Sequence, residues 1–369
     1  MTSALLRKFR PLLALAAVGL LSGCNLVLLN PAGDVAAQQG DLIVYATIMM
    51  MLVIGPVMAL TVFFAWQYRQ SNEKARYEPE WGHSISLEIV IWAVPLAIIV
   101  VLAGLTWVAT HRLDPYADLI RIDEETPITE DVQPMQVQVV ALDWKWLFIY
   151  PEEQIATVGE MAVIEDRPVE FHLTSNTVMN AFYIPEMAGM IYTMAGMQTE
   201  LNAVLNYPGT FEGFSANYSG NGFSGMRFDV LSSDGASFDA WVKKVRADGT
   251  ELNREAFVEL EEPSKNNPVA YFDSVAQGLW DRVLNHCVGE DEICLNDMMM
   301  VDALGGGGIE GLYNRELFRG LCSADDPETL FLMLREEHAD LKSEILSAMT
   351  LLPPSQDVPL QQSTPLETN

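Results

Sequence analysis

The sequence predicts a membrane-anchored protein built from a two-helix transmembrane hairpin, an all-β sandwich and a helical C-terminal extension. Residues 42–68 and 89–110 contain no Asp, Glu, Lys or Arg. Each stretch reaches the roughly 20 residues that cross a bilayer as a helix. Residues 135–230 show instead the two-residue alternation of half-buried strands. Short amphipathic segments follow from Ser237 onward, so we expect three consecutive structural regions.

The charges beside the two apolar stretches predict how the hairpin is oriented. We place the second helix at 87–110, and the loop at 69–86 carries Arg69, Lys74 and Arg76. Residues 24–41 contain no Lys or Arg. Because positively charged loops remain in the cytoplasm, the loop is expected there. The N-terminal segment and the large domain are then expected in the periplasm.

The N-terminus has the features of a bacterial lipoprotein signal. Residues 1–23 combine a basic start, an apolar run and a final Leu-Ser-Gly before Cys24. The run is too short to span a bilayer, although an unlipidated signal peptide remains the alternative. We expect Cys24 to be the mature N-terminus and to carry lipid anchored in the bacterial inner membrane.

The formal net charge is −29, and most of the acidic residues follow the second apolar stretch. An acidic domain repels the phosphates that a nucleic-acid-binding protein attracts with Lys and Arg. We therefore exclude nucleic acid as a partner and interpret the charge as a solvated surface.

The region 115–235 is expected to form the β-sandwich. Apolar Val169, Phe171 and Leu173 alternate with polar neighbours, among them His172, which we expect to be exposed. Turn residues recur at 206–209 and 232–235, as an antiparallel Greek-key sandwich requires.

The extension at 236–352 is expected to be helical. Its helices are predicted at 237–246, 254–260, 275–285 and 326–352. The tail at 353–369 is rich in Pro, Gln, Ser and Thr and is predicted to be disordered.

Three cysteines lie in the extension, at Cys287, Cys294 and Cys322. In an oxidising periplasm the nearest pair, Cys287 and Cys294, is the leading disulfide candidate, worth roughly 2–3 kcal/mol if unstrained. Sequence does not choose among the three pairings.

The most informative stretch is 213–226, Gly-Phe-Ser-Ala-Asn-Tyr-Ser-Gly-Asn-Gly-Phe-Ser-Gly-Met. It resembles the dinuclear copper motif Cys-x-Glu-x-Cys-Gly-x-x-His-x-x-Met of haem-copper oxidases. Upstream, Val-Met-Asn-Ala-Phe-Tyr-Ile-Pro at 178–185 resembles the segment that supplies a further histidine. Thiolate, imidazole and thioether donors hold copper in both redox states, and only the thioether of Met226 is kept. The other ligand positions hold Asn180, Ser215, Asn217, Ser219 and Phe223.

This pattern resembles subunit II of the cytochrome bo-type ubiquinol oxidases, the branch of the haem-copper oxidase superfamily without the dinuclear copper site. Further marks are Leu-Asp-Trp-Lys-Trp-Leu-Phe-Ile-Tyr-Pro at 142–151, Ala-Gly-Met-Gln-Thr at 195–199 and Phe-Asp-Ala-Trp-Val at 238–242. The resemblance extends from the lipoprotein signal to about residue 290. It implies a cupredoxin-like sandwich that lacks copper ligands.

The resemblance also implies a function. The chain would be a non-catalytic subunit of a proton-pumping quinol:oxygen oxidoreductase, the terminal oxidase of an aerobic respiratory chain. It would hold no cofactor, because the haems and copper belong to subunit I, its main partner. Subunits III and IV would complete the complex, ubiquinol would be the substrate, and cytochrome c would not be a partner. Trp144 and Trp146, which lie near the electron entrance in copper-bearing relatives, would be structural.

Glu88 is the one ionisable residue expected to contribute to turnover. The segment Glu-Ile-Val-Ile-Trp-Ala-Val-Pro at 88–95 resembles the one whose glutamate lies at the mouth of a proton channel in subunit I. A first-turn glutamate that complements the helix dipole, worth about 0.3–1 kcal/mol, is the alternative.

Two rival functions require bound copper. The first is a copper-handling membrane lipoprotein that uses Met187, Met190, Met194, Met197 and the methionines at 298–300. The second is a cytochrome c oxidase subunit II with a displaced copper site. Methionine more often fills a protein core than binds metal, so neither rival is favoured.

Overall fold

The computed structural model describes residues 27–303, apart from 76–79, 130–131, 290–291 and 293. The chain divides into two compact units, 1–289 and 290–369, and of the second unit only helix α7 (Leu295–Ala303) and a few preceding residues are described. The predictions for Cys24, Cys322, the helix at 326–352 and the tail at 353–369 lie outside the described residues.

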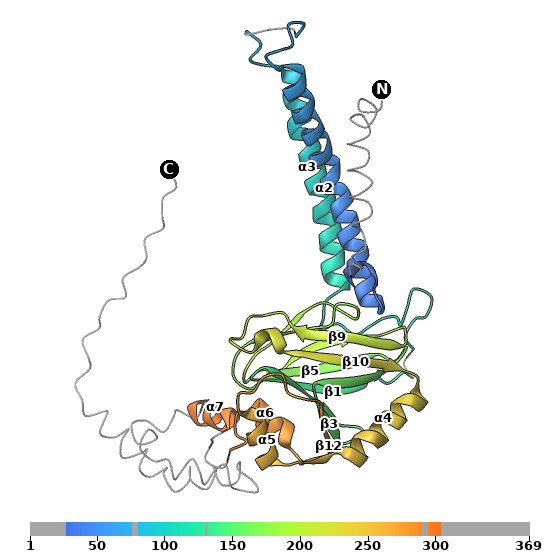
Figure 1. Ribbon diagram of the computed structural model, residues 1–369, viewed down its shortest axis with the longest axis vertical. Helices are drawn as coiled ribbons and strands as arrows, with labels where there is room; N and C mark the ends of the chain where they lie inside the picture. Colours follow the sequence, from blue (N-terminus) through green and yellow to red (C-terminus); the bar gives the residue numbers. More distant parts are fainter. Residues whose placement is uncertain (1–26, 76–79, 130–131, 290–291, 293, 304–369) are drawn as a thin grey trace, which may run out of the picture. The chain divides into compact units, whose positions relative to one another are not determined.

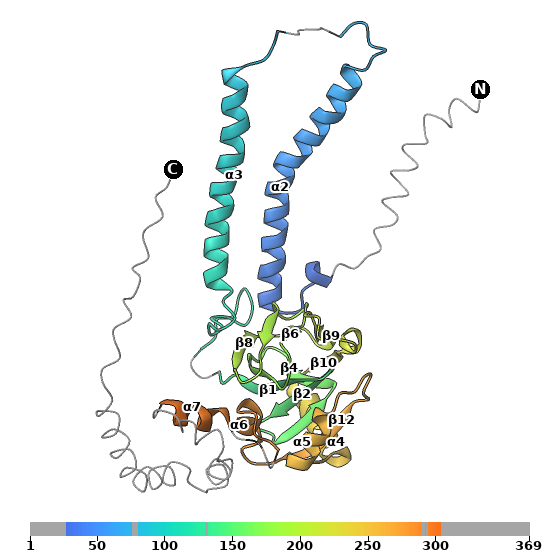
Figure 2. The ribbon, with the colours of Figure 1, turned by 90° about the vertical axis from the view of Figure 1, so that its left-hand side faces the viewer.

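Two long helices form the hairpin, α2 (Asp34–Gln67) and α3 (Ile85–Arg112), and a short turn of 3-10 helix, η1 (Val27–Leu29), precedes them (Figures 1 and 2). Both helices are long and apolar enough to cross a membrane, and their apolar windows are not buried inside the chain. Helix α2 begins before the predicted residue 42, because Asp34, Val35 and Ala36 of its first turn are buried against the sandwich. Sequence composition alone could not show that contact.

The two residues just before α2 are held by backbone hydrogen bonds to the sandwich. The amides of Ala32 and Gly33 donate to the Glu186 carbonyl, both at 2.9 Å, and the Asn206 amide donates to the Ala32 carbonyl at 2.7 Å. A Cβ atom at Gly33 would lie 2.1 Å from the Val204 carbonyl oxygen, so only glycine fits there. The membrane hairpin is thereby joined to the domain at a defined point.

The domain is a sandwich of two sheets. The larger sheet has the order β11 (Thr250–Leu252), β12 (Ala270–Val275), β3 (Ile155–Val158), β2 (Lys145–Tyr150), β1 (Met135–Leu142), β5 (Val169–Ser175) and β8 (Thr199–Ala203). The smaller sheet has the order β4 (Glu160–Ile164), β10 (Arg227–Ser233), β9 (Gly209–Ser215), β6 (Asn180–Tyr183) and β7 (Ile191–Thr193). The predicted β-sandwich after a two-helix hairpin is confirmed.

The sequence predicted an antiparallel sandwich, but three strand pairs are parallel. Strands β1 and β5, β4 and β10, and β11 and β12 pair in parallel. For β1 and β5 the reason is that the chain passes through β4, in the other sheet, and then returns in the direction of β1. Parallel neighbours need such a crossover rather than a tight hairpin.

Aromatic rings fill the space between the two sheets. Trp146 lies edge-on to Phe182 and Phe228, with centroids 5.3 and 5.9 Å away, and the Phe182 and Phe228 rings stack 7° from parallel at 5.4 Å. All three residues are buried. Burial of several large rings in one cluster is a major source of stability for the domain.

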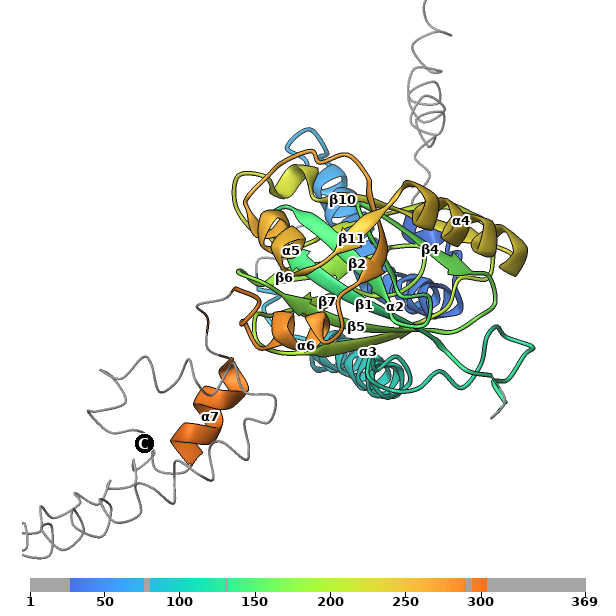
Figure 3. The same cartoon turned by 90° about the horizontal axis from the view of Figure 1, so that it is seen from below.

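A second core covers the outer face of the larger sheet. Leu147 and Ile149 of β2 pack there with Phe257 of α5 (Arg254–Glu261), Phe272 of β12 and Val283 of α6 (Leu279–Leu284). Helix α4 (Gly235–Asp248) packs its buried face against the first core instead, and Figure 3 shows the helices around the sheet. Every residue of β2 is consequently buried. Residues 270–275 form strand β12 ahead of a helix shorter than the predicted 275–285.

Candidate functional site

The candidate site is the loop that joins β9 to β10, together with the start of β6. Ser215 ends β9 beside Phe182 in the register of β6, and Asn180 opens β6. The loop contains a short 3-10 helix, η2 (Phe223–Gly225), and Met226 precedes β10. The fold therefore brings the 178–185 segment next to the 213–226 segment, as the matched motif predicts.

Asn180 and Ser215 face each other inside the protein. The Ser215 hydroxyl donates to Asn180 Oδ1 at 3.1 Å, and the Asn180 side-chain amide donates to the Val178 carbonyl at 3.0 Å. The two residues are 1% and 3% exposed. A buried carboxamide and hydroxyl are stable because each is hydrogen-bonded to protein. Two lost ligand positions have thus become a closed polar pair.

The other three substituted positions differ in their contacts. The Asn217 side-chain amide donates to the Met179 carbonyl at 3.0 Å, and the Phe223 ring lies edge-on to Tyr218 at 5.6 Å. The Ser219 hydroxyl is buried and has no hydrogen-bond partner in the described part of the chain. Asn217 and Phe223 therefore stabilise the loop through contacts of their own, whereas the Ser219 hydroxyl does not.

Trp144 packs against the loop. Its indole N–H donates to the Ser219 carbonyl at 2.9 Å, and a Cβ atom at Gly222 would lie 2.3 Å from the indole ring. Gly220 has a φ of +107°, which glycine adopts readily. Lys265 Nζ lies 5.4 Å from the centre of the ring. The loop is therefore packed against a tryptophan and shaped by glycines.

The donor set of this site does not fit copper. Met226 keeps its thioether and is 1% exposed, but the matched positions Asn180 and Ser215 offer a carboxamide and a hydroxyl in place of imidazole and thiolate. Soft donors are what a copper centre that changes redox state requires. Among the described residues no group of three or more His, Cys, Asp or Glu is arranged to hold a metal ion.

Comparison with known proteins identifies the family. Cytochrome bo(3) ubiquinol oxidase subunit 2 of Pseudomonas aeruginosa is 47% identical over 272 residues, which are 74% of this chain and 80% of the relative. Ubiquinol oxidase subunit 2 of Acetobacter aceti is 44% identical over 284 residues, 77% and 90% of the two chains. The chain belongs to the quinol oxidase subunit 2 family. Residues 246–291 match the COX Aromatic Rich Motif family.

A solved structure is also similar to part of the chain. The periplasmic domain of subunit II of cytochrome oxidase from Bradyrhizobium japonicum has a TM-score of 0.29 and 18% sequence identity, and the match covers 30% of this chain and 91% of that one. The family assignment rests on the sequence relatives.

The COX Aromatic Rich Motif match lies in the second core of this quinol oxidase subunit. Residues 246–291 include β11, α5, β12 and α6, whose apolar side chains cover the outer face of the larger sheet. Sequence analysis assigned this segment to a helical extension and missed its two strands. Strand β12 pairs with β3, which is far away in the sequence, and β11 is too short to show a periodic pattern. Local periodicity therefore does not reveal either strand.

Glu88 lies in the first turn of α3, where its side chain is 52% exposed. Its Oε1 is 3.1 Å from His83 Nε2, a partner that sequence analysis missed. The position suits both the proton-channel prediction and a favourable interaction with the helix dipole.

The methionines proposed for a copper-handling role differ widely in burial. Met187 is fully buried in the first core, whereas Met190 and Met197 are 43% and 53% exposed. A shared soft-metal site needs thioethers that converge. The quinol oxidase family assignment does not favour this rival function either.

Two smaller predictions have different outcomes. His172 was expected to be exposed, but its side chain is only 17% exposed, because it packs beside Glu170 at 3.3 Å and Gln198 at 3.1 Å. Cys287 and Cys294 are each disulfide-bonded, and that they bond to one another stays a prediction.

Glu186 is a further residue that sequence analysis missed. Its carboxylate Oε2 is buried and has no hydrogen-bond partner in the described part of the chain. Burial raises the pKa of this side chain above its ordinary 4.5, and the nearby Glu212 charge raises it further. Its own carbonyl receives the amides of Ala32 and Gly33, so this acid lies where the hairpin meets the sandwich.

Proposed function

We propose that this chain is the non-catalytic subunit II of a quinol-oxidising, proton-pumping terminal oxidase in the bacterial inner membrane. Its periplasmic sandwich would cap subunit I, which would hold the haems and the copper. Subunits III and IV would complete the complex. The observation that carries the proposal is the buried Asn180–Ser215 pair. Two uncharged side chains that are hydrogen-bonded to each other occupy the positions of two copper ligands.

That pair supports quinol as the electron donor. A cytochrome c oxidase receives electrons from a water-soluble protein in the periplasm and relays them through the copper of subunit II. Without soft donors at this site, a copper relay of that kind is not expected to form there. A quinol dissolved in the membrane can deliver its electrons directly to subunit I, so such an oxidase needs no relay.

The choice of donor can be tested on the purified complex. We expect oxygen consumption with ubiquinol and none above background with reduced cytochrome c. A cytochrome c oxidase preparation in the same assay shows that the cytochrome is competent. Comparable turnover with cytochrome c would contradict the proposal.

The second part of the proposal assigns Glu88 to the entrance of a proton path at the cytoplasmic end of α3. Its exposure and its contact with His83 support a site that exchanges protons with water and a neighbouring subunit. Glu88→Gln is expected to lower ubiquinol turnover at normal haem content, whereas Glu88→Asp retains much of it. Glu80→Gln, at an exposed acid in the loop that precedes α3, is the matched control. Wild-type turnover in Glu88→Gln would leave only the helix-dipole role, worth a few tenths of a kcal/mol.

The third part concerns the membrane anchor. Cleavage before Cys24 and diacylation of its sulfur would add a lipid anchor to two transmembrane helices with a cytoplasmic loop. The apolar stretch before Cys24 and the Lys and Arg residues between the helices support this arrangement. The intact mass of the purified subunit should lack residues 1–23 and include at least a diacylglycerol group. An unchanged mass and cleavage in Cys24→Ser would contradict it.

A further inference from the structure

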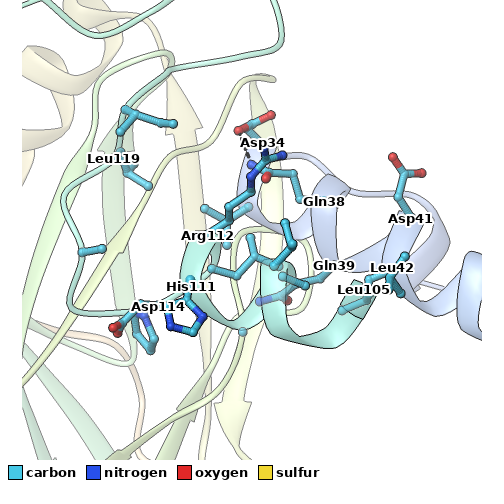
Figure 4. A pocket seen from close by; sticks show the side chains of 18 of the residues that line it. Asp34, Gln38, Gln39, Asp41, Leu42, Leu105, His111, Arg112, Asp114 and Leu119 are labelled. Carbon is cyan, nitrogen blue, oxygen red and sulfur yellow. Dashed lines mark hydrogen bonds between the residues drawn. The ribbon is translucent and has the colours of Figure 1, made fainter. Parts of the chain in front are cut away.

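A cavity of about 1140 Å³ lies where the two membrane helices meet the sandwich. Figure 4 shows polar side chains of α2, among them Asp34, Gln38 and Asp41, and Leu105 of α3 around it. Its volume exceeds the roughly 300–1,000 Å³ of a pocket for a drug-sized molecule. A ligand larger than a single small ring system is needed to fill it.

One wall of the cavity is fixed by a partly buried ion pair. Arg121 donates to both carboxylate oxygens of Asp34, each at 2.9 Å, and the Gln38 side-chain amide donates to Asp34 Oδ2 at 2.8 Å. The Asp34 side chain is only 6% exposed. A bidentate pair of this kind holds its geometry, and the two charges compensate each other. This wall is preformed and contributes little net charge.

The cavity crosses the boundary between membrane and water. Trp107 and Tyr45 are 69% and 56% exposed near the periplasmic ends of α3 and α2, where aromatic rings mark the headgroup level. Deeper along α3 the lining is apolar, with Val100, Val101 and Leu105. A Cβ atom added at Gly104 meets no atom within 4 Å, so the cavity is open at this depth. The deep part is suited to a hydrocarbon chain.

The lining of the cavity carries charges of both signs. Arg112 lines it from the last turn of α3, and Asp41, Asp114 and Asp118 also line it. None of these four side chains forms an ion pair with another described residue. A headgroup that brings a phosphate to Arg112 and an ammonium to the carboxylates would satisfy both signs. An anionic headgroup would match Arg112 but would be repelled by the acids.

We propose that this cavity binds one phospholipid of the periplasmic leaflet with a zwitterionic, ammonium-bearing headgroup such as phosphatidylethanolamine. Its phosphate lies near Arg112, its ammonium lies near Asp114 and Asp118, which follow Arg112 in the chain, and an acyl chain runs past Gly104 between α2 and α3. The lipid fills the gap between the hairpin and the sandwich and stabilises the orientation that the Asp34–Arg121 pair defines.

The test counts lipids on the intact oxidase complex by native mass spectrometry. Gly104→Leu places a side chain where the acyl chain runs, and Gly55→Leu, an equally open position on α2 outside the cavity, is its matched control. We expect Gly104→Leu to retain one phosphatidylethanolamine fewer than the wild type and than Gly55→Leu. Equal lipid counts in the two variants would overturn the proposal and would indicate that a neighbouring subunit fills the cavity.

A second variant decides the question if Gly104→Leu does not assemble. Arg112→Gln removes the phosphate partner, and Arg69→Gln removes an exposed arginine outside the cavity as its control. On delipidated complex titrated with dioleoylphosphatidylethanolamine, we expect Arg112→Gln to weaken binding roughly tenfold or more, as the loss of a charge-assisted hydrogen bond predicts. Dioleoylphosphatidylglycerol should bind the wild type at least about tenfold more weakly than the ethanolamine lipid. Unchanged binding in Arg112→Gln, or equal binding of the two lipids, would contradict the assignment.

Discussion

The substituted loop and the aromatic core beneath it are neighbours with different kinds of stabilisation. They meet where Ser215 pairs with Phe182 and where Met226 precedes the strand that carries Phe228. The core is held by buried rings, whereas the loop is held by single hydrogen bonds and one supporting tryptophan. The comparison teaches that apolar packing, rather than the loop, is the main source of stability for the sandwich. It also predicts a graded response to mutation.

The largest effect is expected in the core. Phe228→Ala removes a ring that contacts Trp146, Phe148 and Phe182, and it should lower the free energy of unfolding by about 3–5 kcal/mol. Tyr218→Ala, which removes a 75% exposed ring from the loop, should cost under about 0.5 kcal/mol. Unfolding of the full-length chain in detergent, followed by tryptophan fluorescence, measures both. Similar losses in the two variants would contradict the distinction between core and loop.

An intermediate effect is expected at the buried polar pair. Ser215→Ala leaves Asn180 Oδ1 without its donor and should cost about 1–3 kcal/mol of stability. Replacing both members, as Asn180→Leu with Ser215→Ala, should cost less than the sum of the two single changes, because no buried polar atom of the pair then remains unpaired. A double-mutant cycle from the same unfolding measurement gives the coupling. If the stability losses of the two single variants add up to that of the double variant, the hydrogen bond contributes nothing to stability.

The smallest effect is expected at Glu186, where the hairpin meets the sandwich. Its pKa is raised above 4.5 by burial, so its contribution to stability is present below that pH and is lost as pH rises through the folded value. Glu186→Gln should therefore stabilise the chain at neutral pH, by about half a kcal/mol or less because the group is partly exposed, and should be neutral below pH 4.5. The exposed Glu124→Gln is the control. The prediction fails if the stabilisation does not depend on pH.

Sequence predicts best those features that depend on neighbouring residues. The absence of charge over residues 42–68 is enough to locate a membrane helix, and the motif at 213–226 is enough to locate the substituted ligand positions. The start of α2 was missed because Asp34 is buried by Arg121, 87 residues away. The half-buried state of His172 likewise depends on Gln198 of another segment.

The second core and the buried polar pair show the same limit. The two outer strands of the larger sheet are recognisable only once they lie beside β3, and local periodicity does not reveal such a pairing. Asn180 and Ser215 are 35 residues apart, and no periodicity indicates that their side chains form a hydrogen bond. The residue types alone show that the copper ligands are lost. The hydrogen bonds that the replacing side chains form can be seen only in the structure.

The central claim, that this site has exchanged a copper centre for hydrogen-bonded packing, is tested most directly by copper binding to the full-length chain in detergent. The wild-type chain should take up no stoichiometric copper after incubation with Cu²⁺ and reductant, and it should lack the near-infrared absorbance of a mixed-valence pair. A variant with restored donors serves as the positive control and carries Asn180→His, Ser215→Cys, Asn217→Glu, Ser219→Cys and Phe223→His. Two copper ions per wild-type chain together with that absorbance would contradict the account.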